Sequence, residues 1–124
     1  MKRDMDLVRQ ILMQVEDADG PVYAEKLGFR DTSEECVLYH VQIMQQHGLV
    51  DAHINYRNGN VPYSGKVFGL TWDGHDFLDA VRDDKLWSRT KKTVKDVSGS
   101  ITVETLKQTA IWLTELAIKS SIGM

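Results

Sequence analysis

Residues 48–74 read GLVDAHINYRNGNVPYSGKVFGLTWDG, a stretch rich in residues typical of strands and turns. It contains two β-prone runs, at 49–56 and 66–72, which a polar, turn-rich segment separates. The segment includes Asn58-Gly59, a dipeptide typical of hairpin turns because both residues tolerate a positive φ. The stretch therefore predicts a β-hairpin with a long tip.

Before the hairpin, residues 4–17 predict an amphipathic helix. Asp4 is its expected N-cap, and the sequence DGP at 19–21 is a strong helix stop. We expect Arg9 on the polar side of this helix. Apolar residues recur at spacings of three and four, as on one face of a helix: Met5, Val8, Ile11, Leu12 and Val15.

A second long helix is predicted over residues 33–47, between an N-cap oxygen on Thr32 or Ser33 and a stop at Gly48. Its inward-facing residues are expected to be Val37, Leu38, Val41 and Met44. Between the two long helices, residues 22–29 favour one or two helical turns over a strand. The predicted order is therefore helix, short helix, helix, hairpin.

Three parts of the chain are expected. The first is a domain at 1–84, closed by a helix that Thr71 or Asp73 caps. The second is a basic, partly helical connector at 85–100, and the third is an apolar helix at 101–124. The fold class that these elements predict is α+β and mainly helical.

The C-terminal helix is too apolar for a helix with only one covered face in a small protein. It either crosses the core of the domain or pairs with a second subunit, and both can hold at once. Trp is frequent in interface hot spots, so a homodimer is favoured. Its expected seam consists of Leu106, Trp112, Leu113 and Leu116.

The composition suits one globular core, with 42% hydrophobic and 27% charged residues in a chain of 124. No stretch approaches the ~20 apolar residues that cross a bilayer, and the start, MKRDMDLVRQ, lacks the apolar core of a secretory signal. We therefore expect a cytoplasmic protein without membrane contact. The sequence lacks a phosphate loop, a nucleophile elbow and an HExxH motif, so neither catalysis nor a cofactor is expected.

The net charge of −3 is unevenly distributed. Residues 1–81 hold 7 Lys/Arg and 13 Asp/Glu, whereas residues 82–124 hold 8 and 5. DNA is a dense line of phosphates, so an acidic domain binds it only where its few cations gather on one face.

Cys36 and His40 lie one helical turn apart, a spacing that can place a thiolate and an imidazole on one metal ion. A third ligand is missing from the local sequence, although His47, His53 or His75 could approach in space. Cysteine is more often a small buried hydrophobic residue, so no metal site is expected. As the only cysteine, Cys36 also excludes an intrachain disulfide.

Two motifs resemble those of bacterial winged-helix regulators. VLYHVQIM at 37–44, followed by GLV at 48–50, resembles the recognition helix and strand entry of small metal- and stress-responsive repressors. LTWDG at 70–74, followed by FL at 77–78, resembles the exit from the wing. The resemblance implies a winged helix-turn-helix domain, with three helices and a β-hairpin wing, followed by C-terminal helices.

Over nearly its whole length the chain also resembles a family of uncharacterised bacterial and prophage proteins. The resemblance is carried by MKRDMDLVR at 1–9, YHV at 39–41 and LTWDGHDFL at 70–78. It implies a winged-helix-like domain and a bacterial or phage setting.

These features favour a DNA-binding regulator of bacterial or prophage gene expression. Amides pair with adenine in the major groove and cations with phosphates, so double-stranded DNA is expected to contact Tyr39, Gln42, Gln46, Arg57, Lys66, Lys91, Lys92 and Lys95. The alternative is a non-enzymatic adaptor that binds a protein partner, because no Lys or Arg lies between Asp31 and Tyr56. Cations that converge on the side of Gln42 favour DNA, and scattered cations favour the adaptor.

Overall fold

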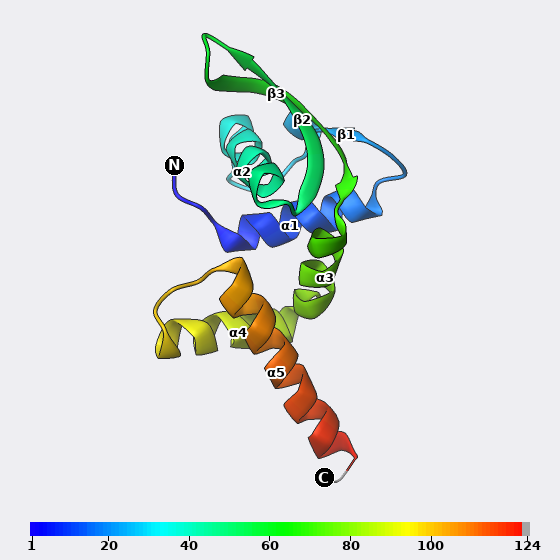
Figure 1. The fold of residues 1–124 in the computed structure, drawn as a ribbon, viewed down its shortest axis with the longest axis vertical. Helices are drawn as coiled ribbons and strands as arrows, with labels where there is room; N and C mark the ends of the chain where they lie inside the picture. The colour runs from blue at the N-terminus through cyan, green and yellow to red at the C-terminus, as the bar shows by residue number, and fades with distance from the viewer. Residues whose placement is uncertain (123–124) are drawn as a thin grey trace. The chain divides into compact units, whose positions relative to one another are not determined.

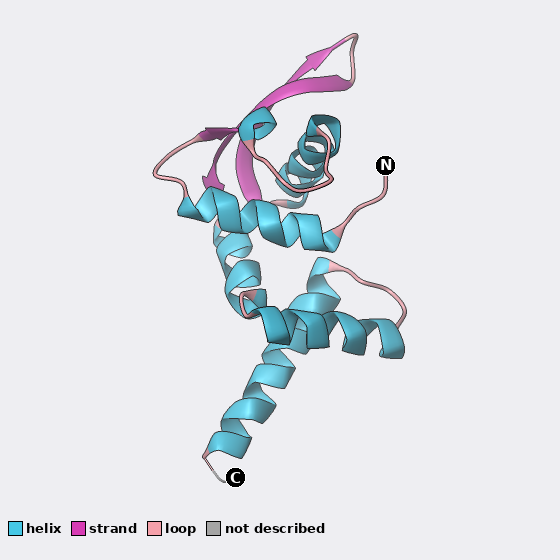
Figure 2. Cartoon of the chain, turned by 180° about the vertical axis from the view of Figure 1, so that it is seen from behind, coloured by secondary structure: helices cyan, strands magenta, loops and turns pink. Residues whose placement is uncertain are grey.

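The computed structural model describes residues 1–122, which combine α-helices with a small antiparallel sheet (Figures 1 and 2). The elements in chain order are α1 (Met5–Asp17), β1 (Val22–Tyr23), the 3₁₀ turn η1 (Ala24–Lys26), α2 (Glu34–His47), β2 (Val50–Arg57), β3 (Val61–Leu70), α3 (Trp72–Val81), α4 (Asp84–Val97) and α5 (Val103–Ser121). This is the α+β, mainly helical class that the sequence predicts. Among residues 1–122, none of the helices combines the length and apolarity that crossing a membrane requires.

The chain forms two compact units, Met1–His75 and the residues from Asp76 onward. The division falls within α3, whereas the sequence placed the end of the first part at residue 84. Each unit has its own packed elements: α1, α2 and the sheet in the first, and the α4–α5 pair in the second.

α1 begins where the sequence predicts. The Asp4 carboxylate accepts hydrogen bonds from the backbone N–H groups of Asp6 and Leu7 at 3.0 and 3.3 Å, which satisfies two donors that the first helical turn leaves open. The expected apolar stripe is buried. Arg9 corrects the expectation of a polar side, because it is only 7% exposed and neighbouring elements therefore cover more of α1 than one stripe.

α2 is also capped as predicted. The Ser33 hydroxyl accepts from the backbone N–H of Cys36 at 3.1 Å, and Gly48 ends the helix in the left-handed region with φ of 89°. The residues expected to face inward are all buried: Val37, Leu38, Val41 and Met44.

His40 joins α2 to the start of α1. Its ring is fully buried, Nε2 accepts from the backbone N–H of Asp4 at 2.8 Å, and Nδ1 donates to the Cys36 carbonyl at 2.8 Å. A neutral imidazole has one donor and one acceptor nitrogen, so both are satisfied. The buried histidine therefore holds the two helices together by polar contacts as well as by packing.

The sheet has the strand order β1-β3-β2, and both pairings are antiparallel. β1 is a two-residue strand, in which Val22 pairs with Val67 and Tyr23 with Lys66. The prediction of helical turns alone over 22–29 was therefore partly wrong: η1 is helical, but the residues before it belong to the sheet.

The hairpin differs from its prediction in the length of its tip. β2 and β3 pair up to Arg57 and Val61, so the tip contains only residues 58–60, with positive φ at Asn58 and Gly59. The expected long tip was therefore wrong, because β3 already begins at Val61 and includes Pro62. A proline is tolerated there because β1 pairs only with residues 66 and 67, which leaves one side of β3 free at residue 62.

The two motifs GLV and LTWDG meet at one junction. The Leu49 carbonyl accepts from the backbone N–H of Thr71 at 3.1 Å, and the Thr71 hydroxyl donates to the Gly48 carbonyl. The same hydroxyl accepts from the N–H of Gly74 at 3.0 Å, as a cap of α3. A Cβ on Gly74 would lie 1.9 Å from the Leu49 oxygen, so only glycine allows α3 to begin against this strand.

In the second unit α4 and α5 pack against each other, and the segment that connects them contains Gly99, which has φ of 70°. α4 is capped by Asp83 and covers residues 85–97 of the segment 85–100, which the sequence predicts to be partly helical. Its buried residues are Trp87, Thr90 and Val94. α5 begins at Thr102, in a reciprocal capping box with Thr105, and buries Leu106, Ala110 and Leu113.

Candidate nucleic-acid interface

The exposed side of α2 carries the residues expected to contact bases. Tyr39 and Gln42 are partly buried and Gln46 is exposed, and their spacing of three and four places them along one side of the helix. The rings of Tyr39 and His40 form an edge-to-face contact, with 5.5 Å between ring centroids and an interplanar angle of 82°. The two glutamates of the first turn, Glu34 and Glu35, are also exposed.

The hairpin extends this side of α2. The Gln42 amide donates to the Tyr56 hydroxyl of β2 at 3.2 Å, so the helix and the strand form one polar surface. The guanidinium of Arg57, the next residue, lies 4.4 Å from the centroid of the Tyr63 ring. Stacking on this ring orders Arg57 and leaves its planar donors available for an anion.

Lys66 lies on the other face of the sheet. Its neighbours on β3 point towards α2: Val67 is fully buried, and a Cβ on Gly65 would lie 3.2 Å from the Leu38 side chain. Successive side chains of a strand point to opposite faces, so Lys66 points away from α2. The expected pairing of Lys66 with the α2 surface is therefore not present.

The remaining expected cations belong to the second unit. Lys91 is partly buried, with its amine 5.4 Å from the centroid of the Trp87 ring, while Lys92 and Lys95 are exposed on α4. Residues four apart share a helix side, so Lys91 and Lys95 lie one above the other.

The α5 residues expected in a dimer seam divide into two groups. Leu106 and Leu113 are 0% and 3% exposed, so their side chains are covered in the single chain. Trp112 and Leu116 are 53% and 38% exposed and remain available to a partner.

The Cys36 and His40 pair is arranged as a structural contact. The Cys36 sulfur lies 3.7 Å from Nδ1 of His40, but both ring nitrogens already have backbone partners. Within residues 1–122, no group of three His, Cys, Asp or Glu side chains is placed to hold a metal ion.

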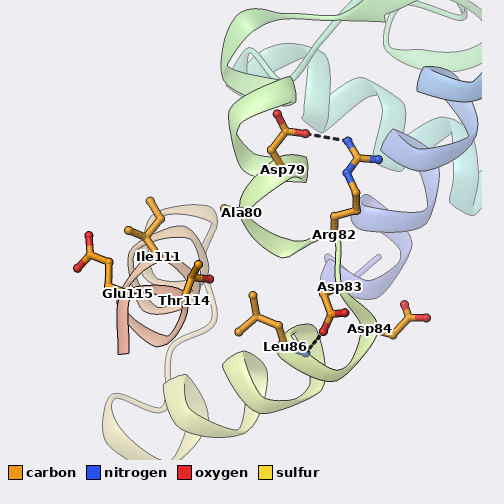
Figure 3. Close-up of a pocket in the computed structure, with 9 residues that line it drawn as sticks. All are labelled: Asp79, Ala80, Arg82, Asp83, Asp84, Leu86, Ile111, Thr114 and Glu115. Atoms are coloured by element: carbon orange, nitrogen blue, oxygen red, sulfur yellow. Dashed lines mark hydrogen bonds and ion pairs between the residues drawn. The ribbon is translucent and has the colours of Figure 1, made fainter. Parts of the chain in front are cut away.

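Figure 3 shows an open groove in the second unit that the sequence did not predict. It is lined by Asp79, Ala80, Arg82, Asp83, Asp84, Leu86, Ile111, Thr114 and Glu115. Three of its polar side chains have structural partners, because Arg82 binds Asp79 at 2.7 Å and Asp83 accepts from the Leu86 N–H at 2.8 Å. The groove depends on the α4–α5 packing, which no local motif encodes.

Comparisons with known proteins agree with the resemblance to an uncharacterised family. A family model described as "Hypothetical protein (DUF2513)" matches residues 2–101. A relative from Haemophilus influenzae, with the name "Uncharacterized protein", is 37% identical over 113 residues, which cover 89% of this chain and 92% of the relative. No solved structure matches the chain significantly. The extent of the family match and the similarity of this relative show that the chain belongs to the DUF2513 family.

Proposed function

We propose that residues 1–75 form a winged helix that binds double-stranded DNA and regulates bacterial or prophage genes. The order α1, β1, η1, α2, β2, β3 with the sheet order β1-β3-β2 supports this proposal. In such a domain the helix before the hairpin enters the major groove. α2 is then the recognition helix and the β2–β3 hairpin is the wing.

The hydrogen bond between Gln42 and Tyr56 carries the proposal. It joins the exposed side of α2 to the wing, next to the hairpin tip that carries Arg57. The Gln46 amide matches the donor and acceptor pattern of adenine, and Arg57 matches a phosphate. Because α2 itself has no Lys or Arg, few phosphates are neutralised, and we expect binding to be weak and only moderately salt dependent.

Fluorescence anisotropy with labelled duplex DNA tests this role of Arg57. We expect Arg57→Ala to weaken binding by roughly three- to tenfold and to lower the slope of log K against log salt by about one. Lys66→Ala is the matched control, since it removes a cation from the same hairpin but away from the tip: Lys66 pairs with His53, whereas Arg57 pairs with Val61 beside the tip. Equal losses in the two variants, or no duplex binding even at low salt, would contradict the proposal.

The acidic first turn of α2 favours a second candidate function. Glu34 and Glu35 are exposed and would repel phosphates if α2 approached DNA end-on. A protein partner with a basic surface would instead be attracted to them. If duplex DNA does not bind, an adaptor role is the better proposal, and Glu34→Lys with Glu35→Lys should then abolish capture of that partner.

We also propose that α5 pairs with α5 of a second copy. An antiparallel pairing centred near Ala117 places Glu115 opposite Lys119 of the second copy, and two-fold symmetry repeats this pair. Trp112 and Leu116 are exposed on this helix and would supply the apolar contacts.

Light scattering coupled to size-exclusion chromatography measures the dimer directly. At micromolar concentration we expect twice the chain mass of 14.1 kDa for the wild type and a single chain mass for Trp112→Lys with Leu116→Lys. Val97→Lys is the control, because Val97 is a strongly exposed apolar residue on α4. A wild type that is monomeric at these concentrations would refute the pairing.

A further inference from the structure

A cluster of aromatic rings and amines occupies the face of the sheet that points away from α2. This outer-face cluster consists of Tyr23, Lys26, Lys66 and Phe68. The Lys66 amine lies 5.9 Å from the centroid of the Tyr23 ring and 5.7 Å from that of Phe68, so it stands between the two rings. The Lys26 amine is also 5.9 Å from the Tyr23 ring.

The backbone directs these side chains outward. Tyr23 pairs with Lys66 across the β1–β3 ladder, so both occupy the same face. The register of β2 against β3 shifts between Asp51 and Ala52, which leaves Phe68 without a partner residue on β2. Such a bulge redirects a side chain, and here it presents Phe68 beside Lys66.

The rings are open to solvent. Tyr23 is 49% exposed and Phe68 is 47% exposed. Farther along the same face, the Asn55 amide donates to the Ser64 hydroxyl at 2.8 Å, and Asn55 is exposed. One carboxylate, Asp51, is also exposed on the outward side of β2.

This combination fits one ligand chemistry. Bases of a single strand stack on exposed rings, and the amines between the rings bind the phosphates of its backbone. Duplex DNA cannot use the rings in this way, because its bases are already stacked and paired. An apolar protein surface is disfavoured, since covering the rings would also remove Lys66 from water.

We propose that the outer-face cluster binds single-stranded nucleic acid by stacking bases on Tyr23 and Phe68. This activity goes beyond the proposed duplex binding, which uses α2 and the hairpin tip. The two surfaces share no residue, and each is testable without the other.

Anisotropy of a fluorescein-labelled oligothymidine of about 15 nucleotides, measured with the full chain at low salt, tests the proposal. We expect Tyr23→Ala and Phe68→Ala each to weaken binding about tenfold, and Phe68→Tyr to retain it, because a tyrosine ring also stacks. Lys66→Gln should lower the salt slope by about 0.7, as for one phosphate contact to a single strand.

Gln46→Ala is the control that separates the two proposals, because Gln46 is exposed on α2, so its loss should weaken duplex binding and leave oligothymidine binding unchanged. Amide chemical shifts of the wild type on adding oligothymidine provide a measurement that needs no variant. Changes centred on β1 and on residues 66–68 support the cluster. Three results would overturn the proposal. The first is shift changes confined to α2, and the second is the absence of oligothymidine binding at low salt. The third is unaltered binding by a Phe68→Ala variant whose circular dichroism matches that of the wild type.

Discussion

Gly74→Ala is expected to lower the free energy of unfolding of the first unit by more than about 4 kcal/mol, or to prevent its folding. The added Cβ would lie 1.9 Å from the oxygen and 3.0 Å from the carbonyl carbon of Leu49. That carbonyl cannot move easily, because it also accepts from the backbone N–H of Thr71. The start of α3 and the segment before β2 would have to separate.

Urea denaturation followed by circular dichroism measures this effect. Gly20→Ala and Gly28→Ala are matched controls, because a Cβ at either position meets nothing within 4 Å. Both controls should retain the wild-type stability to within about 1 kcal/mol, since they change only the entropy of the unfolded chain. A Gly74→Ala protein with the same urea midpoint as the controls would show that the contact between Gly74 and the Leu49 carbonyl does not limit the stability of the first unit.

His40→Ala is expected to lower the free energy of unfolding by about 3–5 kcal/mol. The substitution removes a fully buried ring and leaves the Asp4 N–H and the Cys36 carbonyl without their histidine partner. His40→Leu retains much of the volume and removes only the hydrogen bonds, so we expect a smaller loss of about 1–3 kcal/mol.

The control for these two variants is His47→Ala, which changes an exposed histidine on the same helix and should alter the stability by no more than about 0.5 kcal/mol. Equilibrium unfolding in urea compares all three. If His40→Leu were as stable as the wild type, the polar contacts of His40 would make no net contribution to the stability of the first unit.

The helix boundaries could be predicted because the groups that set them are close in sequence. Asp4, Ser33 and Thr102 each bind N–H groups two or three residues later, and Gly48 ends α2 through its own backbone conformation. These contacts do not depend on the rest of the fold, so the residue types alone indicate them.

The features that were missed depend on partners distant in sequence. β1 has two residues, too few for an alternating pattern, and it forms only because β3 lies beside it. Pro62 argues against a strand locally, yet it lies where β3 has a free side.

The candidate interface was predictable only in part. The spacing on α2 places Tyr39, Gln42 and Gln46 on one side, which depends on helix geometry alone. The Gln42–Tyr56 contact requires the hairpin to fold against α2. The direction of the Lys66 side chain depends on Gly65. Because Gly65 has no side chain, β3 can approach Leu38 there, and this contact fixes the face of the sheet to which Lys66 points.

The contact between Asp4 and His40 has a consequence for hydrogen–deuterium exchange. An N-cap amide has no partner within its own helix, and such amides near the start of a chain normally exchange rapidly. The Asp4 amide instead donates to a fully buried ring nitrogen on α2. Its exchange therefore requires α1 and α2 to separate, so a single amide ahead of the first helix reports how often the interior of this unit opens.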